Sequence, residues 1–177
     1  MRKKRGSRKP RATVVDLPPP PKLRLRAATL SDARFLFRLR NDPVTRAASF
    51  RSDEIRFADH VDWLTARLRD PRRTTRLFVV LLGDDAVGQV RFDHEDRHDE
   101  ISVALVAGAR GKGLGTSLLT RASEAALRRG VPRVLARVKP DNEASIRAFE
   151  RAGFRRSGAL RKKPAPHVVL LYQPKPR

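Results

Sequence analysis

The chain has 177 residues and carries 40 Lys and Arg against 19 Asp and Glu, a net charge of +21. It contains no cysteine, which excludes disulfides, thiolate nucleophiles and cysteine metal sites and agrees with a cytoplasmic location. No apolar run is long enough to span a membrane, and the charged N-terminus lacks the apolar core of a secretory signal.

The positive charge is concentrated at the two ends of the chain. Residues 1–11 hold seven Lys or Arg and residues 151–177 hold eight, both without an acid, so residues 12–150 carry about +6. The four prolines at 18–21 predict a stiff spacer. We therefore expect a disordered basic tail over 1–21, one domain over 22–173 and a basic end over 174–177. The basic ends predict nonspecific contact with anions or nucleic acid.

Hydrophobic periodicity predicts the first half of the domain. Alternation over 23–27 indicates a strand, and the following helix, capped by Thr29 or Ser31, ends at Asp42-Pro43. A second helix is expected over 57–69. Short runs rich in β-branched residues at 76–82, 86–93 and 100–106, joined by turns at 83–85 and 94–99, predict an antiparallel meander. His94 and His98 fall in the second turn, where we expect solvated side chains rather than a metal site.

The second half alternates helices and strands. Apolar residues spaced by four predict a helix over 113–129, stopped by Gly130, and then a strand over 133–138. A helix over 141–153, capped by Asp141 or Asn142, precedes a last strand over 167–172. The expected fold class is α/β, with a mixed, mostly antiparallel central sheet and helices on both faces. No metal site is expected.

The stretch "ARGKGLG" (109–115) joins a predicted strand to a predicted helix. Glycines at such a junction leave backbone N–H groups free at a positive helix end, which suits a pyrophosphate. The P-loop spacing does not fit, and the dinucleotide fingerprint requires glycine where Thr116 stands. A glycine turn that binds no ligand is the alternative.

The same stretch resembles the Arg/Gln-x-x-Gly-x-Gly/Ala signature of the GNAT acetyltransferase superfamily. Residues 138–154, "VKPDNEASIRAFERAGF", resemble the strand and helix that follow in that superfamily. "GQVRFD" and "EISVAL" precede the signature in the expected order, so the resemblance covers about residues 23–172. It implies a GNAT-like acyl-CoA N-acyltransferase fold and direct transfer of an acetyl group from acetyl-CoA to a primary amine.

The resemblance also implies where acetyl-CoA binds. The pyrophosphate is expected on the backbone of 111–116, and the pantetheine arm between the splayed ends of strands 100–106 and 133–138. Phe149 stands where the family often has a tyrosine acid, which leaves Ser145 or water to assist the departing thiolate. The cofactor-binding residues predicted in this way are Val103, Leu105, Arg110, Gly111, Lys112, Gly113, Leu114, Gly115, Thr116, Asn142 and Phe149.

Acetyl transfer requires a neutral amine, and Glu100 is the candidate base, directly or through water. Strand alternation puts Glu100 on one face with Ser102, and the preceding strand offers Gln89 and Arg91 to the same acceptor cleft. The alternative is that Glu100 is a structural ion-pair partner, for example of Arg91.

The stretches "RNDPVTR" (40–46) and "HVDW" (60–63) resemble a GNAT subgroup that acetylates nucleotide-linked amino sugars and, more distantly, ribosomal-protein and antibiotic acetyltransferases. The acceptor-binding residues are accordingly predicted to be Arg40, Asn41 and Arg46 together with Gln89 and Arg91. A small-molecule amine is the expected acceptor. A protein or peptide N-acetyltransferase, or a nucleic-acid-binding protein that uses its basic tails, are the alternatives, and a monomer or homodimer is expected.

Overall fold

A computed structural model of the chain describes residues 23–95, 97–157 and 167–173. The expected tail over 1–21 and the basic end over 174–177 lie outside the described residues. The elements are β1 (Leu23–Ala27), η1 (Leu30–Asp32), α1 (Ala33–Asn41), α2 (Pro43–Ala48), α3 (Phe57–Arg69), β2 (Thr75–Leu82), β3 (Asp85–Glu95), β4 (His98–Leu105), η2 (Ala107–Ala109), α4 (Leu114–Arg128), β5 (Val134–Val138), α5 (Glu143–Arg151), β6 (Arg155–Arg156) and β7 (Val168–Tyr172).

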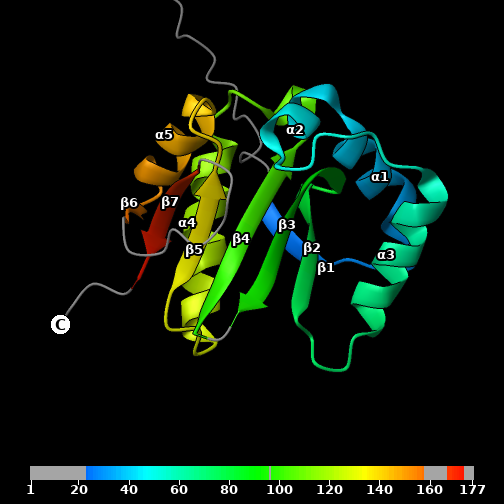
Figure 1. Cartoon of the computed structure of the whole chain (residues 1–177), viewed down its shortest axis with the longest axis horizontal. Helices are drawn as coiled ribbons and strands as arrows, with labels where there is room; N and C mark the ends of the chain where they lie inside the picture. The colour runs from blue at the N-terminus through cyan, green and yellow to red at the C-terminus, as the bar shows by residue number, and fades with distance from the viewer. Residues whose placement is uncertain (1–22, 96, 158–166, 174–177) are drawn as a thin grey trace, which may run out of the picture.

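The strands form one seven-stranded sheet in the order β1-β2-β3-β4-β5-β7-β6 (Figure 1). Among the described strands, β4 and β5 are the parallel pair and all other neighbours are antiparallel. This topology confirms the predicted mixed, mostly antiparallel sheet. Across the described ranges, no helix is long and apolar enough to cross a membrane.

The two faces of the sheet carry separate hydrophobic cores. Alternate residues of β2 divide between them: Val80 packs with α4 and α5 on one face, whereas Leu77 and Val79 pack with α1 and α3 on the other. Helices α1, α4 and α5 are amphipathic, so each buries one apolar stripe against its face. The expected placement of helices on both faces is therefore confirmed.

Helix α2 and strand β6 were not expected. Asp42-Pro43 ends α1 as predicted, but the same pair also starts α2. The Asp42 carboxylate accepts the Thr45 N–H at 2.8 Å, and proline suits a first helical position because its missing N–H has no helical partner. The pair therefore works as a junction between two helices rather than as a helix end alone.

The turn predicted over 94–99 is shorter in the structure. Strand β3 continues to Glu95 and β4 begins at His98, so His94 pairs with Asp99 across the hairpin. Asp99 is fully buried, and its carboxylate binds the Arg76 guanidinium and, at 2.9 Å, Nδ1 of His94. These two partners allow a carboxylate to occupy a strand position that sequence polarity assigns to a solvated turn.

Candidate functional site

Strands β4 and β5 separate soon after they meet. Their ladder consists of Asp99 opposite Val134 and Glu100 opposite Leu135, whereas β4 runs on to Leu105 and β5 to Val138. Both strands keep their outer neighbours, since β3 pairs with β4 through Leu105 and β7 pairs with β5 through Val138. The result is a wedge in the middle of the sheet, closed at Glu100 and open at Leu105.

Backbone groups on β4 face this wedge. The Asp99 N–H points toward β5 and bonds the Arg133 carbonyl at 3.2 Å, whereas the Val106 N–H points the other way, to Val87 of β3. Since backbone direction alternates along a strand, the N–H and C=O of Val103 point into the wedge beyond the last ladder pair. An extended chain lying there could pair with Val103 as a further strand does.

The glycine turn lies at the open end of the wedge. Gly111 and Gly113 both have φ of +74°, and Gly113 is the N-cap residue of α4. The helix begins with no side-chain cap, so its first N–H groups point out of the helix without a covering side chain. A Cβ on either glycine would meet no atom within 4 Å, which leaves room for a ligand against the backbone. The turn therefore fits a pyrophosphate.

Arg110 is bound within the protein. Its Nε donates to the Leu105 carbonyl at 2.8 Å, and its Nη2 reaches Asp42 Oδ2 at 2.5 Å and Thr45 Oγ1 at 3.2 Å. The hydrogen bond from Arg110 holds the pKa of Asp42 below its usual value. Arg110 thus joins the glycine turn to the start of α2, and Lys112 is the exposed cation that remains beside the turn.

Helix α2 is tied to both sides of the open wedge. Arg110 anchors its first residues to the end of β4, and Lys139, just after β5, donates to the Ala47 carbonyl at 2.7 Å. Figure 1 shows α2 above the upper end of β4. Sequence reasoning assigned no site role to Asp42 or Lys139, because their partners lie 68 and 92 residues away in the chain.

Helix α5 starts beside the other strand of the wedge. Asn142 is its N-cap, and its Oδ1 accepts the Ser145 N–H at 3.1 Å. Phe149 is 6% exposed and packs edge-on against Phe154, with ring centroids 4.9 Å apart. Tyr172 pairs with Val134 at the closed end, and burial, with the charge of Glu124, raises its pKa. Neither aromatic residue places a proton donor at the open end.

The predicted polar rows lie side by side on the face that carries α1 and α3. Gln89 is opposite Ala104, Arg91 is opposite Ser102 and Asp93 is opposite Glu100. Arg91 forms an ion pair with Asp93 at 2.8 Å and lies over the Trp63 ring at 5.9 Å from its centroid.

Glu100 has a different partner from the one considered above. It pairs with Arg137 of β5, not with Arg91, at the point where β4 and β5 diverge. Arg137 also lies 3.7 Å from Glu95. Glu100 therefore combines an ion pair with a position at the vertex of the wedge. Arg137 is a site residue that the sequence did not indicate, because parallel pairing brings it to Glu100 from 37 residues away.

Arg40, Asn41 and Arg46 organise the segment 49–56. Arg40 donates to the Arg51 carbonyl at 2.7 Å and Arg46 to the Ser52 carbonyl at 2.9 Å. The Asn41 amide makes two hydrogen bonds with the Ile55 backbone. Burial lowers the pKa of Arg40, and the charges of Arg46 and Arg91 add to this effect. Arg40, Asn41 and Arg46, which were predicted to bind the acceptor, stabilise the conformation of the loop 49–56 through these hydrogen bonds.

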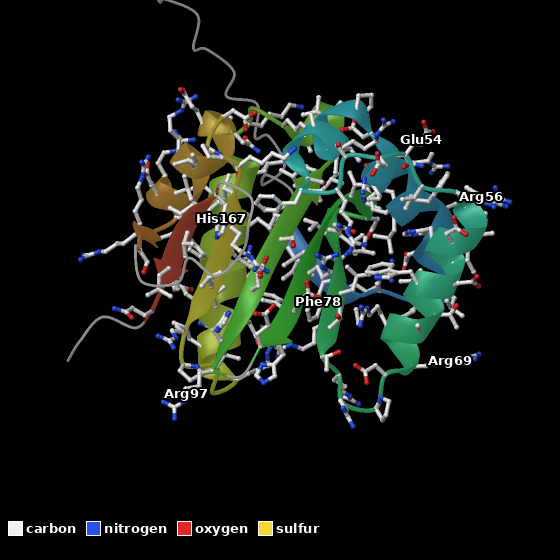
Figure 2. All side chains as sticks on the ribbon, viewed as in Figure 1. Glu54, Arg56, Arg69, Phe78, Arg97 and His167 are labelled. Atoms are coloured by element: carbon white, nitrogen blue, oxygen red, sulfur yellow. The ribbon has the colours of Figure 1, made fainter. Side chains whose placement is uncertain are left out.

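The loop reaches the open end of the wedge. The Phe50 ring lies edge-on to His167, which immediately precedes β7, with centroids 6.2 Å apart. Figure 2 shows His167 near the top of β5 and β7, while Glu54 and Arg56 extend outward near the start of α3. A loop from the first half of the described domain and the residue before its last strand therefore meet at the open end of the wedge.

A wedge between parallel strands, with a glycine turn and an uncapped helix at its open end, is the arrangement that the resemblance to the GNAT acetyltransferases implies. The sequence matches the family described as "Acetyltransferase (GNAT) domain" over residues 22–155. The chain therefore belongs to the GNAT acetyltransferases and is an acetyl-CoA-dependent N-acetyltransferase.

Individual relatives are more distant. An L-methionine sulfoximine/L-methionine sulfone acetyltransferase from Pseudomonas paraeruginosa (strain PA7) is 29% identical over 147 residues, covering 77% of this chain and 82% of that protein. The structure of the aminoglycoside acetyltransferase AAC(6')-Ib with coenzyme A and kanamycin aligns with a TM-score of 0.74 at 21% identity, covering 86% of this chain and 95% of that one. Spermidine N-acetyltransferase from Vibrio cholerae, with CoA and spermine, aligns at 0.73 and 22% identity, covering 84% and 92%.

Proposed function

We propose that the enzyme acetylates a small primary amine that also carries a negatively charged group. The observation that carries this proposal is the polar row of Arg91, Ser102 and Glu100 beside the wedge. The Arg91 side chain is one-third exposed and lies over the Trp63 ring; its Nε is ion-paired with Asp93, and its other guanidinium N–H groups are suited to an acceptor's phosphate or carboxylate. The net charge of about +6 over residues 12–150 attracts such an acceptor and repels polyamines.

Glu100 is the proposed base. When bound, acetyl-CoA supplies the acetyl carbonyl, and the amine nitrogen bonds to that carbon as the carbon–sulfur bond breaks. Three residues of strand separate Glu100 from Val103, about 10 Å, so the amine proton reaches the carboxylate through water. In this proposal the Val103 N–H donates to the carbonyl oxygen of the acetyl group. A thiol with a pKa of about 8.5 leaves as a thiolate without a strong acid, and Ser145 or water assists it.

The first candidate acceptor is a nucleotide-linked amino sugar, supported by the resemblance of 40–46 and 60–63 to that subgroup. The second is an α-amino acid, favoured by the likeness to the L-methionine sulfoximine acetyltransferase. Both carry an anion near the amine. They differ in size, because a nucleotide extends well beyond the polar row.

A panel of amines assayed for release of free CoA tests this proposal. It contains amino-sugar nucleotides, L-methionine sulfoximine, spermidine, an aminoglycoside and a lysine peptide. We expect kcat/KM to be at least 10-fold higher for one of the two anionic classes than for spermidine or the aminoglycoside. Preference for a cationic amine or for the peptide would refute the anionic acceptor while leaving the acetyltransferase assignment intact.

A further inference from the structure

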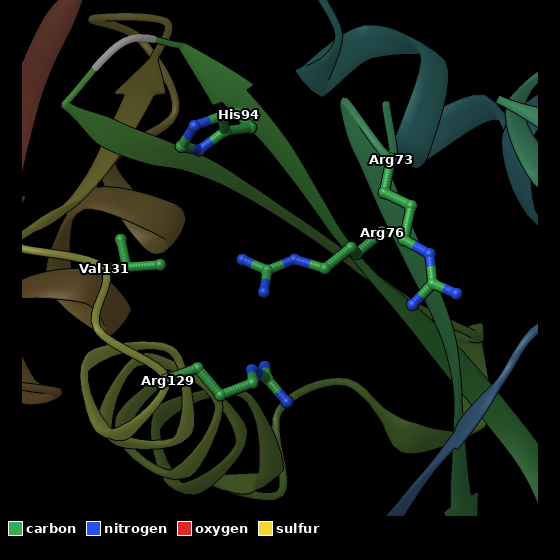
Figure 3. Close-up of a pocket in the computed structure, with 5 residues that line it drawn as sticks. All are labelled: Arg73, Arg76, His94, Arg129 and Val131. Atoms are coloured by element: carbon green, nitrogen blue, oxygen red, sulfur yellow. The ribbon is translucent and has the colours of Figure 1, made fainter. Parts of the chain in front are cut away.

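A group of basic side chains lies near the closed end of the wedge. Arg73, Arg76, His94, Arg129 and Val131 line a hollow of about 430 Å³, which we call the basic hollow. Figure 3 shows Arg76 extending into its middle, between His94 and Arg129 and toward Val131, with Arg73 at the side. Arg129 caps the C-terminal end of α4, whose 15 residues separate it from the glycine turn by roughly 22 Å.

The basic hollow has more positive charge than its carboxylate neutralises. Arg76 is bound to the buried Asp99, which also bonds Nδ1 of His94. Within the described ranges, Arg73 and Arg129 have no carboxylate partner, and the Arg129 guanidinium lies over the Phe78 ring at 5.9 Å from its centroid. Burial lowers the pKa of Arg129, and the charge of Arg76 lowers it further, while the charge of Asp99 acts in the opposite direction. The three arginines and one aspartate therefore leave an excess of two positive charges.

The loop that carries Arg73 is held in a strained conformation. Arg73 has φ of +49°, the one non-glycine residue with positive φ in the described part of the chain. The Asp70 carboxylate fixes the loop by accepting the N–H groups of Arg72 and Thr74 at 2.9 and 3.0 Å and the Thr74 hydroxyl at 2.5 Å. Such strain persists only where surrounding contacts impose it, and it is common at ligand sites.

We propose that the basic hollow binds a small phosphate-bearing anion, at a site separate from the glycine turn. Arg73 and Arg129 come from different elements and face one cavity, and planar guanidinium groups donate paired hydrogen bonds to phosphate oxygens. A diphosphate group would offset the two excess charges. The cavity volume is in the range of small-molecule sites, and the rigid loop removes part of the entropy cost of ordering Arg73.

Binding of inorganic pyrophosphate to protein saturated with CoA tests this site, because CoA blocks the glycine turn. In calorimetry we expect the Arg73→Gln/Arg129→Gln variant to bind pyrophosphate at least 10-fold more weakly than the unmodified protein. The matched control is Arg72→Gln/Arg128→Gln, which removes two neighbouring arginines that are exposed, as Arg73 and Arg129 are, and the same total charge. It should change the Kd less than twofold. Malonate, a dicarboxylate, should bind at least 10-fold more weakly than pyrophosphate.

Equal weakening by both variants would show only general attraction to a basic surface and would overturn the proposal. Absence of pyrophosphate binding to the CoA-saturated protein would overturn it as well, as would equal binding of malonate or binding of a short RNA in place of pyrophosphate. Phenylglyoxal labelling of the unmodified protein, read by mass spectrometry, avoids any folding defect of the variants. Pyrophosphate should protect Arg73 and Arg129 but not Arg72 and Arg128, and equal labelling of all four would refute the site.

Discussion

The glycine turn and the segment 40–56 border the same wedge but are built in different ways. In the turn, the groups that face outward are backbone N–H groups at an uncapped helix start. In the segment, the polar side chains of Arg40, Asn41 and Arg46 already bond the loop's own backbone. The proposed cofactor side therefore depends on backbone conformation, whereas the proposed acceptor side depends on a scaffold of side chains. Acceptor specificity is expected in the polar row beside the wedge, chiefly Arg91 and Glu100.

The largest effect is expected from filling the turn. Gly113→Glu should weaken CoA binding at least 100-fold in calorimetry, because the side chain projects where the pyrophosphate approaches and repels it. The matched control is Gly130→Glu, since Gly130 also has positive φ and open space at its Cβ, but lies just beyond the other end of α4. Both variants should lose about 1–2 kcal/mol of stability from the left-handed backbone.

Equal loss of CoA affinity in the Gly113 and Gly130 variants would mean that strain, not blocked access, is responsible. Unchanged CoA affinity in Gly113→Glu would remove the turn from the cofactor site altogether.

The next effect concerns the acceptor side. Glu100→Gln should lower kcat by roughly 10²-fold at pH 7, the usual scale of general base help. The loss should shrink at high pH, where more of the amine is already neutral. Glu95→Gln is the control, since Glu95 also lies near Arg137 but outside the wedge. If Glu100→Gln keeps full activity at pH 7, the ion pair with Arg137 is its whole role.

The smallest effect tests whether the two regions are coupled. Arg110→Gln should raise the acceptor KM and the Kd for CoA by about 3- to 10-fold each, because Arg110 bonds both the end of β4 and the start of α2. Lys112→Gln removes the same charge from the same turn without a partner in α2, and it should affect the Kd for CoA alone. Matching acceptor KM values in the two variants would show that the regions act independently.

The Arg110–Asp42 pair also predicts a pH dependence of stability. Because the folded pKa of Asp42 is lowered, its contribution is complete above the ordinary aspartate range and is lost as the pH falls through the folded pKa. In urea titrations from pH 6 down to pH 2, Asp42→Asn should therefore lose less stability than the unmodified protein. A double-mutant cycle with Arg110→Gln should give a coupling of about 1 kcal/mol at pH 7 and none at pH 2. If the stability of Asp42→Asn and that of the unmodified protein fell in parallel between pH 6 and pH 2, the ion pair would not be the source of the pH dependence.

Local patterns predicted most of the elements and the glycine turn before α4. Helix α3 occupies Phe57–Arg69 as its periodicity indicates, and α4 starts directly after Gly113. Hydrophobic periodicity and the positive φ that glycine allows depend only on short stretches of sequence, so both can be predicted from the sequence alone. Helix α2 was missed because an Asp-Pro pair marks both a helix end and a helix start, and six residues carry too little periodicity to distinguish them.

By itself, then, the sequence determined the order of the longer elements, the alternation that puts Glu100 and Arg91 on one face, and a glycine turn before α4. The tertiary structure alone decided which charges meet. It pairs Glu100 with Arg137 and Arg110 with Asp42, and it buries Asp99 between Arg76 and His94. The physical reason is that an ion pair depends on strand register and helix placement across tens of residues. A chain with 40 basic residues offers many equivalent partners for each of its 19 acids until the fold selects one.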